Sequence, residues 1–409
     1  MNRVDTIIVG AGQAGLVASY ELKSRGVDHI VFERDRIGEA WRRRWDSFCL
    51  VTPNWTVDLP GFPYDGVYPD GFMQRDAIVE HLQRYAASFD APVREKTPVS
   101  NLRSLPEGGF ELDAGGERWS CASMVLATGA YQKPFRPSAA TLTPSEILQL
   151  DAADYSRPQD LPDGSVLVVG SGQSGCQIAH ELAVAGRDVI LACGRAAWVP
   201  RRIGDRDMAR WVMASGMLDT PASEIPKDAR FAANAIATGQ QDGYDLNFRV
   251  LRAVGVELTG HYVGASKGKL MFADDLAETV AWSDGAQNTF RDGMKKVAKA
   301  AGWPAPEFPE VPAFDPTQTE SVEAQEIGAV LYATGYRPAF SDWLPWSEAF
   351  DDQGFPVQID GSSTKIPGLY FLGMHLLRNR KSSLLAGVGE DASIVASAIS
   401  RSQAESNTA

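Results

Sequence analysis

The stretch Thr6-Ile7-Ile8-Val9-Gly10-Ala11-Gly12-Gln13-Ala14-Gly15 decides the fold. Its short apolar run, which stops at a glycine, is typical of a buried parallel strand. In the G-x-G-x-x-G pattern, the first glycine makes a tight turn from strand to helix and the second lets the backbone approach a pyrophosphate. The third lets the helix pack closely on the strand. Because the helix N-terminus also presents free N–H groups to an anion, we expect a dinucleotide-binding βαβ unit.

The residue after the next strand indicates which dinucleotide this unit binds. The apolar run His29-Ile30-Val31-Phe32 is followed by Glu33, 23 positions after Gly10 (33 − 10). A carboxylate at this place can accept hydrogen bonds from both hydroxyls of an unphosphorylated ribose. The alternative is a glycine-rich turn without a ligand, which the full strand–turn–helix–strand context disfavours.

The same layout returns 160 positions later (170 − 10), where Gly170-Ser171-Gly172-Gln173-Ser174-Gly175 follows another apolar run. Here the second strand ends at Cys193-Gly194-Arg195, with no acidic residue. A guanidinium can pair with a ribose 2′-phosphate through two hydrogen bonds, whereas a carboxylate would repel it. We therefore expect NADPH at this site, with Arg195 as first choice for the phosphate and Arg201 or Arg202 assisting. The alternative is that these arginines solvate a loop.

One carboxylate and one arginine at equivalent places suggest two cofactors, and FAD with NADPH is the usual pair. The predicted fold is therefore α/β, with two Rossmann-like dinucleotide-binding domains. Each is expected to hold a parallel sheet with helices and a small antiparallel meander. The FAD-binding domain is expected to be discontinuous, with residues 1–157 and 336–409. Residues 158–335 form the inserted NADPH-binding domain, in which 204–260 are expected to cover the active site.

Composition excludes several other kinds of protein. The net charge of −13 argues against a nucleic-acid partner. No apolar run is long enough for a membrane span, and the N-terminus runs straight into a strand, so we expect a cytoplasmic protein without a signal peptide. The four cysteines form no C-x-x-C pair, and the five histidines lack metal-ligand spacing. Neither a metal site nor a closely spaced redox dithiol is expected.

Several segments resemble the flavin-containing monooxygenase family. Besides the two fingerprints, the marks are Trp41-Arg42-Arg43-Arg44-Trp45-Asp46-Ser47, Leu59-Pro60-Gly61-Phe62-Pro63 and Tyr332-Ala333-Thr334-Gly335-Tyr336. The last is close to that family's F-A-T-G-Y motif. The chain looks most similar to bacterial flavin-dependent oxidoreductases, and more distantly to plant-type indole-pyruvate monooxygenases. It departs from the family near Asp151, where members often have a histidine.

The resemblance implies a single-component monooxygenase. NADPH would reduce FAD, oxygen would form a C4a-hydroperoxyflavin, and one oxygen atom would pass to a small organic substrate. N- or S-oxygenation is favoured, and Baeyer–Villiger oxidation of a ketone or keto acid is the runner-up. Other readings are an NADPH-dependent flavin reductase or oxidase without oxygen insertion and a dinucleotide-binding redox sensor. The expected partners are a small-molecule substrate and molecular oxygen, with neither nucleic acid nor membrane; a homodimer is also considered.

Residues 42–54 follow the first βαβ unit as a loop and are expected to approach the flavin. Trp45 would give flat apolar contact there, and Thr52 and Asn54 polar contact; these three are the catalytic candidates, with ordinary core packing as the alternative. Segment 382–387 is expected to open the last helix, whose N-terminus would stabilise negative charge on the flavin. The cofactor-binding candidates are Gly10, Gly12, Gln13, Ala14, Gly15, Glu33, Arg34, Trp41, Arg42, Trp45, Thr128, Gly129, Gly170, Gly172, Gln173, Ser174, Gly175, Arg195, Arg201, Arg202, Ala333, Thr334, Gly335, Gly373 and Leu384.

Overall fold

The computed structural model describes residues 1–408, and its first elements form the predicted βαβ unit. Strand β1 (Asn2–Val9) is fully buried from Thr6 onward and turns at Gly10 into helix α1 (Gln13–Ser24). Strand β2 (His29–Phe32) then pairs with β1 in parallel, Thr6 opposite His29. The βαβ prediction for this segment is confirmed.

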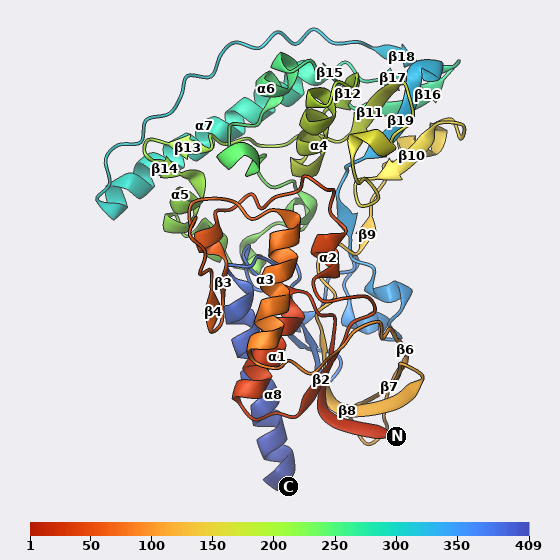
Figure 1. Cartoon of the computed structure of the whole chain (residues 1–409), viewed down its shortest axis with the longest axis vertical. Helices are drawn as coiled ribbons and strands as arrows, with labels where there is room; N and C mark the ends of the chain where they lie inside the picture. The colour runs from red at the N-terminus through yellow and green to blue at the C-terminus, as the bar shows by residue number, and fades with distance from the viewer. Residues whose placement is uncertain (409) are drawn as a thin grey trace.

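The larger sheet joins segments from both ends of the chain, as Figure 1 shows. Strand β23 (Leu369–Phe371) lies parallel to β8 (Glu117–Leu126), which lies parallel to β1, and α1 packs against the C-terminal helix α8 (Val388–Thr408). The antiparallel meander expected in this domain is formed by β6 (Val99–Ser104), β7 (Phe110–Ala114) and β8. The order is β21 (Gln358–Ile359), β22 (Ser362–Ser363), β23 (Leu369–Phe371), β8 (Glu117–Leu126), β1, β2 and β5 (Val93–Arg94), with β6 (Val99–Ser104) and β7 (Phe110–Ala114) attached to β8.

The second sheet is parallel throughout its pairings. Its order is β10 (Leu148–Asp151), β19 (Ile327–Tyr332), β11 (Ser165–Val169), β12 (Val189–Ala192) and β15 (Glu257–Thr259). Helices α4 (Gln173–Val184), α6 (Phe248–Ala253) and α7 (Leu276–Ala301) accompany it, and a small antiparallel sheet joins β16 (Tyr262–Ser266), β17 (Lys269–Phe272) and β18 (Ser321–Glu323). Two parallel sheets, each with an antiparallel addition, confirm the predicted α/β fold class.

The remaining elements are short, apart from two longer helices. Those two are α3 (Arg75–Ser88) and α8 (Val388–Thr408). Segment 204–260 is built mainly of loops and single turns before α6. The short elements are α2 (Glu39–Arg42), β3 (Asp58–Leu59), β4 (Phe62–Pro63), β9 (Lys133–Pro134), β13 (Arg202–Ile203), β14 (Arg206–Asp207), α5 (Met208–Ala214) and β20 (Tyr336–Arg337), with 3-10 turns at Asn54–Thr56, Ser138–Leu142, Pro158–Asp160, Met217–Asp219, Ala222–Glu224, Lys227–Phe231, Gln240–Asp242, Ala324–Glu326, Phe340–Asp342 and Ser347–Ala349.

The chain passes between the two sheets twice. On the way out β9 precedes β10, and on the return β20 follows β19 and pairs with β9 in antiparallel fashion. The two passages therefore lie together. We keep the division into a discontinuous FAD domain and an inserted NADPH domain as a proposal.

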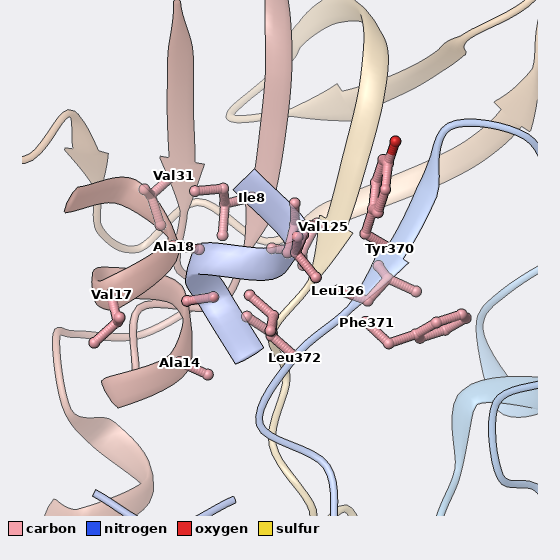
Figure 2. Packing of buried hydrophobic residues seen from close by; sticks show 14 of the residues in the cluster. Ile8, Ala14, Val17, Ala18, Val31, Val125, Leu126, Tyr370, Phe371 and Leu372 are labelled. Carbon is pink, nitrogen blue, oxygen red and sulfur yellow. The ribbon is translucent and has the colours of Figure 1, made fainter. Parts of the chain in front are cut away.

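Each sheet has its own hydrophobic core. In the first, Ile8 of β1, Val17 of α1 and Leu126 of β8 belong to one buried cluster (Figure 2). Full burial of such an aliphatic side chain contributes about 1.5–3 kcal/mol. Trp45 comes from the loop after α2 yet belongs to the second core, so this loop connects the two.

Candidate functional site

The first fingerprint has the shape that a dinucleotide phosphate requires. Gly10 has a φ of +105°, and a Cβ there would lie 2.7 Å from the carbonyl oxygen of Ala127. A Cβ at Gly15 would lie 1.8 Å from the carbonyl oxygen of Gly10, so only glycine permits this approach of helix to strand. A Cβ at Gly12 would meet nothing within 4 Å. The space beside the α1 N-terminus therefore fits a pyrophosphate.

The carboxylate of Glu33 is oriented at the edge of this loop. Its Oε2 accepts a hydrogen bond from the Ala11 N–H at 2.8 Å, and its Oε1 accepts one from the Asp35 N–H at 2.9 Å. Each oxygen keeps a lone pair for a ribose hydroxyl. Arg34 is exposed and pairs with Asp35. The half-buried Glu33 is thus held in the geometry expected for ribose binding.

The second fingerprint repeats the geometry of the first. Gly170 has a φ of +101°, and a Cβ at Gly175 would lie 1.9 Å from the carbonyl oxygen of Gly170. The Ser171 hydroxyl donates to the Gly194 carbonyl at 2.8 Å and accepts from the Gly194 N–H at 2.9 Å. Ala333 lies against this turn, as Ala127 does in the first unit. This cradle also fits a dinucleotide.

The three arginines predicted for the 2′-phosphate have different surroundings. Arg195 and Arg202 are exposed, and neither forms an ion pair within residues 1–408. Arg201 is only 2% exposed. Its Nε donates to Asp207 at 2.7 Å and its Nη1 to the Val51 carbonyl at 2.7 Å. The Arg201 guanidinium is therefore occupied inside the protein, which favours Arg195 over it as a phosphate ligand.

Segments from both ends of the chain meet at the mouth of the first fingerprint. The Trp41 indole N–H donates to the Gln13 side chain at 3.0 Å, and the Gln13 amide donates to the Ser383 carbonyl at 3.2 Å. A Cβ at Gly373 would lie 2.6 Å from Cβ of Ala14. The structure thus brings these predicted residues together. Leu384 follows Ser383 in a turn, and α8 begins only at Val388, so the prediction that residues 382–387 open the last helix is wrong.

An aromatic cluster of Tyr131, Tyr336 and His375 lies next to this junction, and of the two tyrosines the sequence analysis did not single out Tyr131. The Tyr131 ring is 5.1 Å from Tyr336 and 5.0 Å from His375, and the Arg44 guanidinium lies 5.0 Å above it. The Ser383 hydroxyl is 2.8 Å from Nδ1 of His375. Both tyrosines follow a Thr-Gly pair at the end of a strand, in Thr128-Gly129-Ala130-Tyr131 and Thr334-Gly335-Tyr336. That shared pattern could have identified Tyr131.

Burial lowers the pKa of the His375 imidazole and so favours its neutral form. Beside the aromatic cluster, the Gln132 amide donates to the Gly129 carbonyl at 3.0 Å and to the Thr128 hydroxyl at 3.2 Å. The cluster therefore offers one cation, Arg44, among uncharged groups.

The catalytic candidates Asn54 and Trp45 are both buried. Asn54 accepts from the Met73 N–H at 2.6 Å and donates to the Tyr68 carbonyl at 3.0 Å, which closes the loop between them. Trp45 is 1% exposed, and its indole N–H has no partner within the described residues. Thr52 is half-buried. Core packing and loop closure explain Asn54 and Trp45 without a catalytic role, which stays a prediction for all three residues.

Further candidate groups are buried or lie far from both fingerprints. All four cysteines are buried, and none forms a disulfide within the described chain. Burial raises the pKa of Cys49 to about 11 and that of Cys121 to about 12. Residues 1–408 contain neither a cluster of potential metal ligands nor a helix with the length and apolar character of a membrane span. A cavity of about 710 Å³ lies between α7 and residues 308–316, but no predicted site residue lines it.

The family model of the pyridine nucleotide-disulphide oxidoreductases matches residues 7–215. A CzcO-like oxidoreductase of Geobacillus kaustophilus is 30% identical over 95% of this chain and 96% of that protein. The probable indole-3-pyruvate monooxygenase YUCCA3 of Arabidopsis thaliana is 27% identical, over 90% of this chain and 81% of its own length.

Solved structures share the fold at low sequence identity. The flavin-containing monooxygenase from Stenotrophomonas maltophilia superposes with a TM-score of 0.69 at 20% identity, covering 98% of this chain and 99% of that one. The bacillithiol disulfide reductase Bdr from Staphylococcus aureus reaches 0.64 at 12% identity, with the same coverage. The fold therefore accommodates both oxygen and disulfide chemistry, and the choice between them depends on the residues at the site.

Proposed function

The chain belongs to the pyridine nucleotide-disulphide oxidoreductase family and is an FAD-dependent oxidoreductase, and from this premise we propose that it is a single-component monooxygenase. FAD and NADPH are its cofactors. In this proposal one oxygen atom of O₂ enters a small organic substrate at nitrogen or sulfur. The relatives named as monooxygenases support the reaction class.

The observation that carries the proposal is the contrast between the two fingerprints. Glu33, held by two backbone N–H groups, suits the unphosphorylated ribose of FAD. Arg195, exposed and without an ion pair in the described chain, suits the 2′-phosphate of NADPH. We therefore assign FAD to the first cradle and NADPH to the second, with the two cofactors meeting near Tyr131 and Tyr336.

FAD, when bound, accepts a hydride from NADPH and passes the electrons on to oxygen. The protein then has to bind and orient the two cofactors and the substrate, and to exclude water from the site. Gln13, which accepts from the Trp41 indole N–H and donates to the Ser383 carbonyl, would fix the flavin edge. Tyr131 and the neutral His375 would close the site to solvent. This division of labour requires no proton-transfer triad.

The cysteines argue against disulfide reduction, the other chemistry of this fold. That reaction needs two thiols that can form a disulfide and one that ionises readily. Cys176 and Cys193 are buried in the core of the second unit, and burial raises the pKa of both.

Baeyer–Villiger oxidation remains the second candidate, because the Arg44 cation would stabilise negative charge that develops on a ketone oxygen.

The test separates oxygen insertion from simple oxidase activity. The FAD-loaded enzyme is reduced with NADPH without air and then mixed with ¹⁸O₂ and a thioether, a tertiary amine or a cyclic ketone. We expect labelled sulfoxide or N-oxide, with a matching fall in hydrogen peroxide. A labelled lactone would select the second candidate. Stoichiometric hydrogen peroxide with all three substrates would refute the monooxygenase proposal and leave an NADPH oxidase.

A further inference from the structure

The carboxyl ends of β12 and β15 bring a histidine beside the NADPH fingerprint. The two strands pair in parallel with Ala192 opposite Thr259, and the Cys193 N–H donates to the Thr259 carbonyl at 2.9 Å. Two residues further along each strand come Gly194 and His261. A Cβ placed on Gly194 would lie 3.3 Å from Nε2 of His261. The imidazole thus lies over the turn that leads to Arg195.

Asp275 fixes the orientation of this imidazole. The Asp275 Oδ1 accepts a hydrogen bond from the backbone N–H of His261 at 2.9 Å, and its Oδ2 lies 2.5 Å from Nδ1 of the His261 ring. A carboxylate at this distance holds the proton on Nδ1, which leaves Nε2 facing the Gly194 turn. The His261 side chain is 51% exposed, so a ligand can reach Nε2.

Ser171 connects this corner to the phosphate cradle. Its hydroxyl is bonded to both the N–H and the carbonyl of Gly194. The turn that carries Arg195 and supports His261 is therefore held against the fingerprint itself. A dinucleotide whose pyrophosphate occupies the cradle would have its adenosine ribose near the end of β12, where the fold family places it.

We propose that His261, oriented by Asp275, is the second ligand of the NADPH 2′-phosphate beside Arg195. The inference rests on the proposed assignment of NADPH to the second fingerprint. With Nδ1–H directed at Asp275, a proton on Nε2 makes the ring a cation that donates to the phosphate. The nearby Arg252 already donates to the Asp315 and Thr317 carbonyls, so it does not replace His261.

If His261 instead accepted a hydrogen bond from the ligand, the site would select NADH over NADPH. If Nε2 carries no proton it can only accept, and it would then favour the free 2′-hydroxyl of NADH. Asp275 is engaged by His261, and Asp274 accepts from the Gln318 amide. These hydrogen bonds leave both carboxylates charged, and the exposed Arg195 cation is the group that attracts a phosphate to this corner.

The experiment measures binding to the FAD-loaded enzyme by calorimetry, with 2′,5′-ADP and 5′-AMP as probes. His261→Ala should weaken 2′,5′-ADP about tenfold or more, as expected for loss of a charge-assisted hydrogen bond. The affinity for 5′-AMP should change less than about twofold, since it lacks the 2′-phosphate. Lys299→Ala, which removes an exposed cation at the far end of α7, should change neither affinity.

A second variant separates a contact from a local structural effect. His261→Gln places an amide nitrogen near the position of Nε2, so it should restore part of the lost 2′,5′-ADP affinity. Equal losses for both probes, or no loss for either, would overturn the role of His261. If the unaltered enzyme itself fails to prefer 2′,5′-ADP over 5′-AMP, the NADPH assignment of the second fingerprint is refuted instead.

Discussion

Arg201→Ala is expected to destabilise the protein strongly while sparing the preference for NADPH over NADH. The Arg201 guanidinium is buried, bonds Asp207 and donates to the Val51 carbonyl. It therefore ties segment 201–207 to the loop that leads to Asn54. Burial lowers the pKa of Arg201, and the Asp207 carboxylate opposes that shift, which is the signature of a desolvated but paired cation.

The magnitude follows from what the substitution leaves behind. Asp207 is only 6% exposed, and its Oδ1 also accepts from the Ala209 N–H at the start of α5. Removing one partner of a buried ion pair leaves the other charge uncompensated, which costs about 3–5 kcal/mol. Arg201→Lys keeps the charge but loses the guanidinium geometry, so we expect a smaller loss of about 1–3 kcal/mol.

Urea unfolding of the FAD-loaded enzyme, followed by tryptophan fluorescence, measures these changes. The matched control is Arg202→Ala, because Arg202 is the neighbouring residue but is exposed. It should stay within about 0.5 kcal/mol of the unaltered protein. The reasoning is refuted if Arg201→Ala unfolds at the same urea concentration as this control. A selective loss of 2′,5′-ADP binding without loss of stability would return Arg201 to the phosphate site.

The remaining predictions concern three acidic or basic side chains. Arg195→Ala should weaken NADPH at least about tenfold more than NADH, measured as the ratio of their dissociation constants; equal losses would count against the assignment. Glu33→Ala should reduce the FAD content of purified protein, read from flavin absorbance. Burial raises the pKa of Glu181, so stability falls as pH rises above the unfolded value near 4.5. Glu181→Gln should therefore stabilise the protein at pH 7 but not at pH 4.

The features predictable from sequence were those set by local backbone geometry. A strand, a glycine turn and a helix occupy consecutive positions, so both cradles and the places of Glu33 and Arg195 could be predicted. Partners distant along the chain could not be. Arg201 and Val51 are 150 positions apart (201 − 51), and nothing in the sequence indicates that they meet. For the same reason the closure of loop 68–73 by Asn54 was not foreseen.

Strand order explains why a cofactor-specificity residue was overlooked at the second site. The fingerprint pattern includes the residue after the second strand of a βαβ unit, here Arg195, because the distance of that residue from the first glycine is nearly constant. β15 also ends at this edge of the sheet, but its distance from the fingerprint depends on the inserted segment 204–260. Only the register of β12 with β15 shows that His261 lies beside Gly194. Residues that select between NADPH and NADH should therefore be sought at the carboxyl ends of both β12 and β15, and the His261 variants test this view.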